Sequence, residues 1–430
     1  MSFPIFAYIA VLLLAALLST RLMKVLELPN VTGYIITGII MGPFVFGLLF
    51  NNFSYDGIKD SEVFTHVDKI SWVSTVALGF IAFSIGTSFK AKTLKIVGKR
   101  VIIITVLEAL FASIAVFIAM IILHFIIPDK VPLELVFTLS AIAAATAPAA
   151  TLMIIKQYQA RGSLVDTLLP VVALDDAAAL ILFAILFQIA TAISGGGSFD
   201  VYKMILKPII EILISLGIGA VLGLFISWLN RFFMSRNNKL VLCILSVFAS
   251  LGVYILFRNP IMGGFELSSL LMCMMTGAIY ANLCKDSDRT LDIMDRFTSP
   301  IYMMFFVISG ASLDLSIFFN GNGLIIVGIA FAYIIFRVIG KWVGAYMGAS
   351  VTKSEPKIKK YLGFTLIPQA GVAIGLATTA GKLFSLREET AFTGVLVVAI
   401  ILTSTLVYEI VGPMVSKFAL SKAGEIPTEQ

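Results

Sequence analysis

The sequence predicts an all-α polytopic membrane protein with about thirteen transmembrane helices. Three observations support this fold class: the composition, the apolar runs and the distribution of basic residues. Of the 430 residues, 59% are hydrophobic and only 13% are charged, whereas a soluble domain carries roughly 25% charged residues. Apolar runs of about 20 residues, which are long enough to cross a bilayer as helices, recur along the chain. A soluble globular protein is therefore excluded.

Thirteen apolar segments separated by short linkers account for the chain. The longest linker, over 51–69, is acidic and polar. We expect residues 1–430 to form one transmembrane unit with no separate soluble domain. The segments are placed at about 4–23, 31–50, 70–89, 101–127, 133–156, 165–194, 205–229, 239–257, 264–284, 297–317, 322–350, 359–381 and 389–416.

The basic residues set the predicted orientation. With the N-terminus outside, the inner loops hold 21 of the 31 Lys and Arg residues and the outer loops hold 8. This asymmetry follows the positive-inside rule. It predicts a multi-pass membrane protein with its N-terminus outside and its C-terminus in the cytoplasm. The membrane is expected to be the bacterial inner membrane. The asymmetry also accounts for the formal net charge of +6 without a nucleic-acid partner.

The cysteines and histidines give no sign of a resident metal. Cys243, Cys273 and Cys284 lack the spacing of metal ligands, and neither His66 nor His124 has a ligand partner nearby in sequence. We therefore interpret the cysteines as small apolar residues. No cofactor is expected.

Two adjacent carboxylates, Asp175 and Asp176, lie near the middle of the segment over 165–194. An ionised side chain at the bilayer centre costs about 2.5–3.5 kcal/mol on insertion scales, so its presence there indicates a functional role. Adjacent carboxylates repel each other, which makes a purely structural pair a poor choice. Burial and repulsion favour protonation, whereas a bound cation favours the ionised form. The pair therefore predicts a site where a cation and protons compete.

Arg337 and Lys341 are the two basic residues inside an apolar segment, and they share a helix face because they are four residues apart. Each is a candidate charge partner for the aspartates. The alternative for both, and the stronger alternative for Lys341, is that the side chain extends to the membrane interface.

The fifth and the twelfth apolar segments each contain a proline that can interrupt a helix. Pro148 follows Thr146 in the fifth segment, and Pro368 precedes Gln369 and Gly371 in the twelfth. Proline removes a backbone hydrogen bond, so the minimal interpretation of each is a kinked helix. Two interrupted helices in corresponding halves of a transporter instead indicate a binding site at the membrane midplane. Segments four to six and eleven to thirteen would then form an inverted repeat, with the middle helix of each broken.

Four further acids lie closer to segment ends, so structural or interfacial roles are expected for them. They are Glu108, Glu266, Asp314 and Glu409.

Taken together, these motifs resemble the monovalent cation:proton antiporters, in the branch that contains the bacterial sodium/proton antiporters and the glutathione-gated potassium efflux systems. The resemblance extends from Pro29–Tyr34 to Glu409–Pro413 and rests mainly on the paired aspartates. It is carried by Asp175-Asp176, Thr146–Pro148, Arg337–Gly344 and Pro368–Gly371.

The resemblance implies an NhaA-like fold in which an ion-translocating core moves against a dimerisation domain. The core would comprise residues of about 70–194 and 297–418, and the dimerisation helices would span about 1–50 and 205–284. It also implies a homodimer whose contact uses the first helix and one from the middle of the chain.

The resemblance assigns roles to individual residues. Asp176 would carry the ion and the proton, while Asp175 would pair with a basic residue. Arg337 occupies the position where the family has lysine, so we expect an Arg337–Asp175 pair and electroneutral exchange. The alternative is that Lys341 takes the lysine's role, or that Asp175 is itself protonated, in which case two protons move. Thr146 would contribute an oxygen to the ion.

The function predicted from these residues is exchange of a monovalent cation, with Na⁺ first and K⁺ or Li⁺ as alternatives, for H⁺. A potassium efflux channel or uniporter is the main alternative. An organic-ion carrier of similar fold is less consistent with the buried acids. An intramembrane aspartyl protease, and with it an enzyme, is disfavoured because such enzymes place their two aspartates on separate helices.

Overall fold

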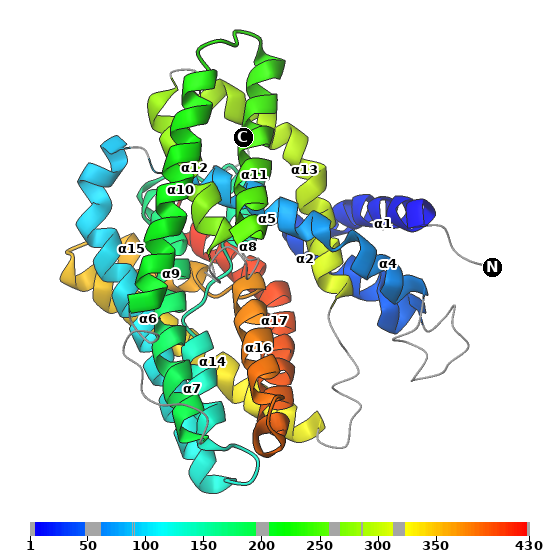
Figure 1. Ribbon diagram of the computed structural model, residues 1–430, viewed down its shortest axis with the longest axis vertical. Helices are drawn as coiled ribbons and strands as arrows, with labels where there is room; N and C mark the ends of the chain where they lie inside the picture. Colours follow the sequence, from blue (N-terminus) through cyan, green and yellow to red (C-terminus); the bar gives the residue numbers. More distant parts are fainter. Residues whose placement is uncertain are drawn as a thin grey trace. The chain divides into compact units, whose positions relative to one another are not determined.

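The computed structural model describes residues 5–47, 62–87, 89, 91–194, 206–257, 267–284, 287–312 and 323–427. Within these ranges the regular structure is helical (Figure 1). Nine helices of the described part are long and apolar enough to cross a membrane, and three shorter apolar helices accompany them. The chain is an all-α polytopic membrane protein, as predicted. The number of thirteen membrane passages stays a prediction.

The chain divides into two compact units, each made of two separate stretches of sequence. The first unit comprises Met1–Leu94 and Glu211–Leu315, and the second comprises Lys95–Ile210 and Ser316–Gln430. The second unit contains the predicted segments four to six and eleven to thirteen. The ranges predicted for an ion-translocating core, about 70–194 and 297–418, also include α5 (Trp72–Thr87) and part of α13 (Ser287–Ala311), which belong to the first unit. The division into core and dimerisation helices stays a prediction.

The first unit depends on close helix packing at glycines. Gly86 on α5 faces the carbonyl of Met274 on α12, and Gly277 on α12 faces the carbonyl of Phe83 on α5. A Cβ at either glycine would collide with the backbone of the other helix. Small residues of this kind let helices approach closely inside a membrane. The other elements of this unit are α1 (Ile5–Val25), α2 (Asn30–Met41), the π-helix η1 (Pro43–Gly47), α4 (Glu62–Ile70), most of α10 (Lys207–Leu229), α11 (Arg236–Phe257) and α12 (Ser269–Leu283).

The second unit repeats one order of elements twice: a long helix, an interrupted helix and another long helix. The first set is α6 (Ala91–Ile126), α7 (Leu133–Ile142) with α8 (Pro148–Gln157), and α9 (Ser163–Ile193). The second set is α14 (Gly323–Val351), α15 (Pro356–Thr365) with α16 (Gly371–Phe384), and α17 (Glu388–Lys422).

Both interruptions occur where the prolines predict them. Pro148 stands in the first turn of α8, and Ala147 before it is extended, because a residue that precedes proline avoids the helical region. The second interruption contains Pro368 and ends at Gly371, the first residue of α16. We call residues 143–147 the first break and residues 366–370 the second break.

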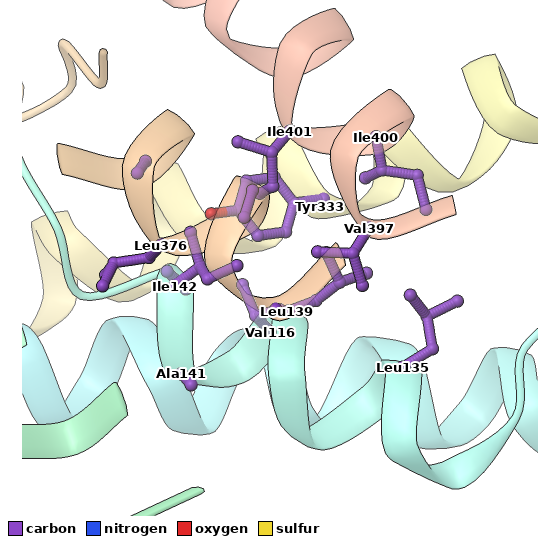
Figure 2. Close-up of a cluster of buried hydrophobic side chains, with 14 of the residues drawn as sticks. Val116, Leu135, Leu139, Ala141, Ile142, Tyr333, Leu376, Val397, Ile400 and Ile401 are labelled. Atoms are coloured by element: carbon purple, nitrogen blue, oxygen red, sulfur yellow. The ribbon is translucent and has the colours of Figure 1, made fainter. Parts of the chain in front are cut away.

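An apolar core holds the helices of the second unit around these breaks. Leu135 and Leu139 of α7 pack in one buried cluster with Tyr333 of α14 and with Val397 and Ile400 of α17 (Figure 2). Because closely packed interiors resist displacement, this cluster fixes the backbone that leads into each break.

Candidate functional site

Asp175 and Asp176 lie inside α9 and are almost completely buried, with 0% and 2% of their surfaces exposed. Successive helix positions point roughly 100° apart, so the two carboxylates leave the helix in different directions. Neither oxygen of Asp176 has a hydrogen-bond partner among the described residues. A buried carboxylate without a partner is costly, so Asp176 is a strong candidate for binding a cation or a proton.

Lys341 is the basic partner of Asp175. Its Nζ lies 2.9 Å from Asp175 Oδ2 and 2.6 Å from Glu108 Oε2. It also donates to the carbonyl of Ala144 in the first break. The ammonium is fully buried; it donates hydrogen bonds to Asp175 and Ala144 and forms an ion pair with Glu108.

Arg337 contacts the backbone of both breaks. Its guanidinium donates to the carbonyls of Ala143 at 3.0 Å, Ala145 at 2.6 Å and Ile367 at 2.8 Å. It also lies 4.7 Å from the centre of the Tyr408 ring. The side chain thus satisfies carbonyls that lost their helical partners.

The predicted Arg337–Asp175 pair is wrong, because Lys341 occupies that place. The planar guanidinium offers several donors in a fixed fork, which suits three backbone carbonyls at once. The compact ammonium of Lys341 instead fits between two carboxylates. The alternative in which Lys341 takes the lysine's role matches the observed contact with Asp175.

Gln369 joins the second break to the first. Its Nε2 donates to the carbonyls of Ile142 at 3.0 Å and Ala145 at 3.3 Å. The backbone N–H of Ala147 donates in turn to the carbonyl of Pro368 at 2.8 Å. The two breaks therefore meet, and each supplies donors to the other.

Thr146 lies in the first break with 1% of its surface exposed. Its Oγ1 has no hydrogen-bond partner among the described residues. The two carboxylate oxygens of Asp176 are likewise buried without a donor in the part of the chain that the structure describes. The role of Thr146 as an oxygen ligand stays a prediction.

Comparison with known proteins identifies the family of this chain. The sequence profile described as "Sodium/hydrogen exchanger, transmembrane" matches residues 9–417. The chain belongs to this family. It is therefore a multi-pass membrane transporter, a cation/proton antiporter, and it is not an enzyme. Among curated proteins, none matches the sequence.

Two solved structures of the sodium proton antiporter MjNhaP1 from Methanocaldococcus jannaschii share the exchanger's fold. The structure at pH 8 has a TM-score of 0.64 at 17% identity, with 97% of this chain and 98% of that chain covered. The structure from an electron-microscopy map has a TM-score of 0.74 at 16% identity, with 99% of each chain covered. At this level of identity the likeness concerns the fold alone.

The exchanger also buries an acidic residue that the sequence analysis placed near the end of a membrane segment. Glu108 on α6 was expected in a structural or interfacial role, but it is 0% exposed and pairs with Lys341 at the site. The interfacial role is wrong because α14 lies directly against α6: a Cβ at Gly344 would fall 2.5 Å from Glu108 Cα. Glu409 is buried as well, whereas Glu266 and Asp314 lie outside the described residues.

One contact of the exchanger is not predicted by the sequence analysis. Glu425, which follows α17, accepts hydrogen bonds from the N–H groups of Leu164 at 2.8 Å and Val165 at 2.9 Å, at the start of α9. Its carboxylate also lies 2.8 Å from Lys357 Nζ. This hydrogen bond raises the pKa of Lys357 above its ordinary value. A carboxylate at a helix N-terminus satisfies free N–H groups and the helix dipole, so Glu425 anchors the helix that carries the aspartates.

Proposed function

We propose that this chain exchanges a monovalent cation for H⁺ by alternating access at Asp175 and Asp176. Na⁺ is the first candidate cargo, and K⁺ and Li⁺ are the alternatives. The observation that carries the proposal is the carboxylate of Asp176, which is buried on α9 and has no hydrogen-bond partner among the described residues. A carboxylate in that setting needs a positive charge, and either a proton or a cation provides it.

The cation binds between Asp176 and the first break. Thr146 contributes its hydroxyl, because Oγ1 has no partner within the described part of the chain. A hard cation at this site would be held by oxygens at roughly 2.3–2.6 Å. A structure that places the bound cation beyond this distance from both oxygens of Asp176 would reject the assignment.

Lys341 and Arg337 have different tasks in this mechanism. Lys341 neutralises Asp175, and Arg337 holds the two breaks together through their carbonyls. The pairing of Lys341 with Asp175 removes the basis for expecting electroneutral exchange, which rested on an arginine beside Asp175. Exchange in proteoliposomes under an imposed membrane potential measures the stoichiometry directly.

Asp176→Asn tests the proposal. The substitution removes the ionisable group and keeps its size, so exchange should fall below about a tenth of the wild-type rate while the protein still folds. Uptake of radiolabelled Na⁺, K⁺ or Li⁺ into proteoliposomes with an internal pH dye measures cation and proton movement together. Asp166→Asn, on the same helix but at an exposed position, is the matched control.

The outcomes of this experiment separate the candidate functions. Cation uptake coupled to proton movement and lost in Asp176→Asn supports the exchanger. Cation movement without any pH change favours a channel or uniporter. Exchange above about a tenth of wild type in Asp176→Asn removes this residue from the site and leaves the pair structural.

The proposed assembly follows the family resemblance, and the proposed orientation follows the distribution of basic residues. The protein is a homodimer in the bacterial inner membrane, with its N-terminus outside and its C-terminus in the cytoplasm. Leu14, Leu17, Leu18 and Leu22 give α1 an exposed apolar face that suits a partner helix or lipid. Native mass spectrometry in lipid measures the oligomeric state, and a monomer there would contradict the dimer.

A further inference from the structure

The site holds an anion that the exchange mechanism above does not use. Glu108 is completely buried, and its Oε2 lies 2.6 Å from Lys341 Nζ. Its Oε1 has no hydrogen-bond partner in the described part of the chain. A carboxylate at such a depth requires compensation, and the observed compensation is the same ammonium that pairs with Asp175.

The contact between Glu108 and Lys341 is built into the packing of α6 and α14. Gly340, Gly344 and Gly348 recur every four residues on α14, and a Cβ at each would collide with α6. The Cβ at Gly344 would meet the backbone of Glu108 itself. Small residues at this spacing bring two helices close together. The glycine stripe thus places the ammonium of Lys341 within reach of Glu108.

Two carboxylates, Asp175 and Glu108, therefore share the single ammonium of Lys341. Arg337 does not supply a second positive charge to either of them. The guanidinium of Arg337 donates to backbone carbonyls of the two breaks. Asp175 uses only Oδ2 for Lys341, and its Oδ1 has no hydrogen-bond partner among the described residues. Asp175 consequently has an oxygen that could turn to a cation beside Asp176.

We propose that Glu108 is a positioning residue of the transport site: it retains the ammonium of Lys341 as a second counterion, and so lets Asp175 share in binding the transported cation. A monovalent hard cation favours several oxygen ligands, and Asp175 is the carboxylate next to Asp176. If Asp175 were the sole partner of Lys341, its turn to the cation would leave a buried ammonium without an anion. With Glu108 in place, the ammonium stays paired. This inference rests on the proposed function.

The test compares four proteins: the wild type, Glu108→Gln, Lys341→Gln and the double variant. In proteoliposomes the KM for Na⁺ should rise at least about tenfold in Glu108→Gln, as expected when one partner of a buried ion pair loses its charge. Glu108→Asp should recover part of this loss. In the Lys341→Gln background the substitution at Glu108 should have no further effect on KM, because no ammonium remains to be held.

A second readout covers variants that transport slowly. The Na⁺ concentration that gives half of the maximal rise in Tm reports cation affinity without turnover, and it should follow the same pattern across the four proteins. Glu134→Gln, which replaces another acid of the second unit that accepts a hydrogen bond from Thr393, is the matched control and should keep the wild-type KM.

The outcomes distinguish this inference from the proposed function. A KM for Glu108→Gln within about twofold of wild type would overturn the role of Glu108 and leave the exchange mechanism intact. So would a rise in KM that persists fully in the Lys341→Gln background, since Glu108 would then act directly on the cation. A wild-type protein that exchanges none of Na⁺, K⁺ and Li⁺ would overturn the proposed function, and this inference with it.

Discussion

The two breaks of the second unit look alike in sequence but differ in what they offer. In the first break the carbonyls of Ala143, Ala144 and Ala145 all accept hydrogen bonds from side chains of other elements. In the second break the carbonyls of Ile367 and Pro368 accept, but Gln369 also donates outward. The first break therefore mainly accepts hydrogen bonds through its carbonyls, whereas the second break both donates and accepts hydrogen bonds.

This difference shows how an interrupted helix is made tolerable inside a membrane. Backbone that leaves a helix there must find other partners, and the exchanger supplies them from Arg337, Lys341 and Gln369. Because these side chains occupy the carbonyls, the buried oxygens without a donor among the described residues of this region are side-chain oxygens, among them Thr146 Oγ1, Asp175 Oδ1 and both oxygens of Asp176. The breaks thus shape the site without themselves providing most of its ligands.

Arg337→Ala should have the largest effect on the breaks. It would remove the side-chain donor of the Ala143 and Ile367 carbonyls, and it would leave the carbonyl of Ala145 with only the longer bond from Gln369. We expect a loss of about 3 kcal/mol or more in the free energy of unfolding, measured as a fall in Tm in detergent. Arg337→Lys should recover little, because an ammonium cannot reproduce the fork. Arg387→Gln, which removes an exposed arginine, is the control, and an equal fall in Tm there would contradict the prediction.

Gln369→Ala should have the next largest effect, because it removes the donor that joins the second break to the first. The carbonyls of Ile142 and Ala145 lose a partner, at a cost of about 1–3 kcal/mol in the free energy of unfolding. Gln369→Glu sharpens the comparison, since a carboxylate cannot donate to these carbonyls and should destabilise at least as much. If Gln369→Glu kept the wild-type Tm, the link between the breaks would not depend on this donor.

Thr146→Val should affect the cation and not the fold. The hydroxyl has no hydrogen-bond partner among the described residues, so Tm should stay close to wild type. The KM for the transported cation should rise about fivefold, as expected when one weak oxygen ligand is removed. Thr146→Ser should behave as wild type. Thr138→Val, which removes a buried hydroxyl bonded within α7, should leave KM unchanged, and an unchanged KM in Thr146→Val would exclude the hydroxyl as a ligand.

Thr151→Val should have the smallest effect. The hydroxyl of Thr151 on α8 donates to the carbonyl of Thr365 at 3.2 Å, just before the second break. Hydrogen bonds between membrane helices contribute about 0.5–1 kcal/mol, so a small fall in Tm with normal exchange is expected. Thr151→Ser should restore Tm. A loss of exchange in Thr151→Val would mean that this contact serves the transport cycle and not only stability.

The sequence by itself determined the fold class and singled out the aspartate pair, and it indicated candidate positions for both breaks. These features depend on local properties: long apolar runs, carboxylates that are costly in a membrane, and prolines that disfavour a helix. Asp175, Pro148 and Pro368 could therefore be singled out as candidates, but Pro170 and Pro413 stand inside the continuous helices α9 and α17, so proline alone does not decide where a helix is interrupted.

Only the tertiary structure decided which charge meets which partner. Arg337 and Lys341 lie one turn apart on the same helix face, so their spacing does not say which of them reaches Asp175. The choice follows from how the backbone of the breaks presents its carbonyls to Arg337. It follows equally from the close packing of α14 on α6, which brings Glu108 to Lys341. Contacts between elements far apart in sequence depend on packing, and a periodic pattern within one helix does not encode them.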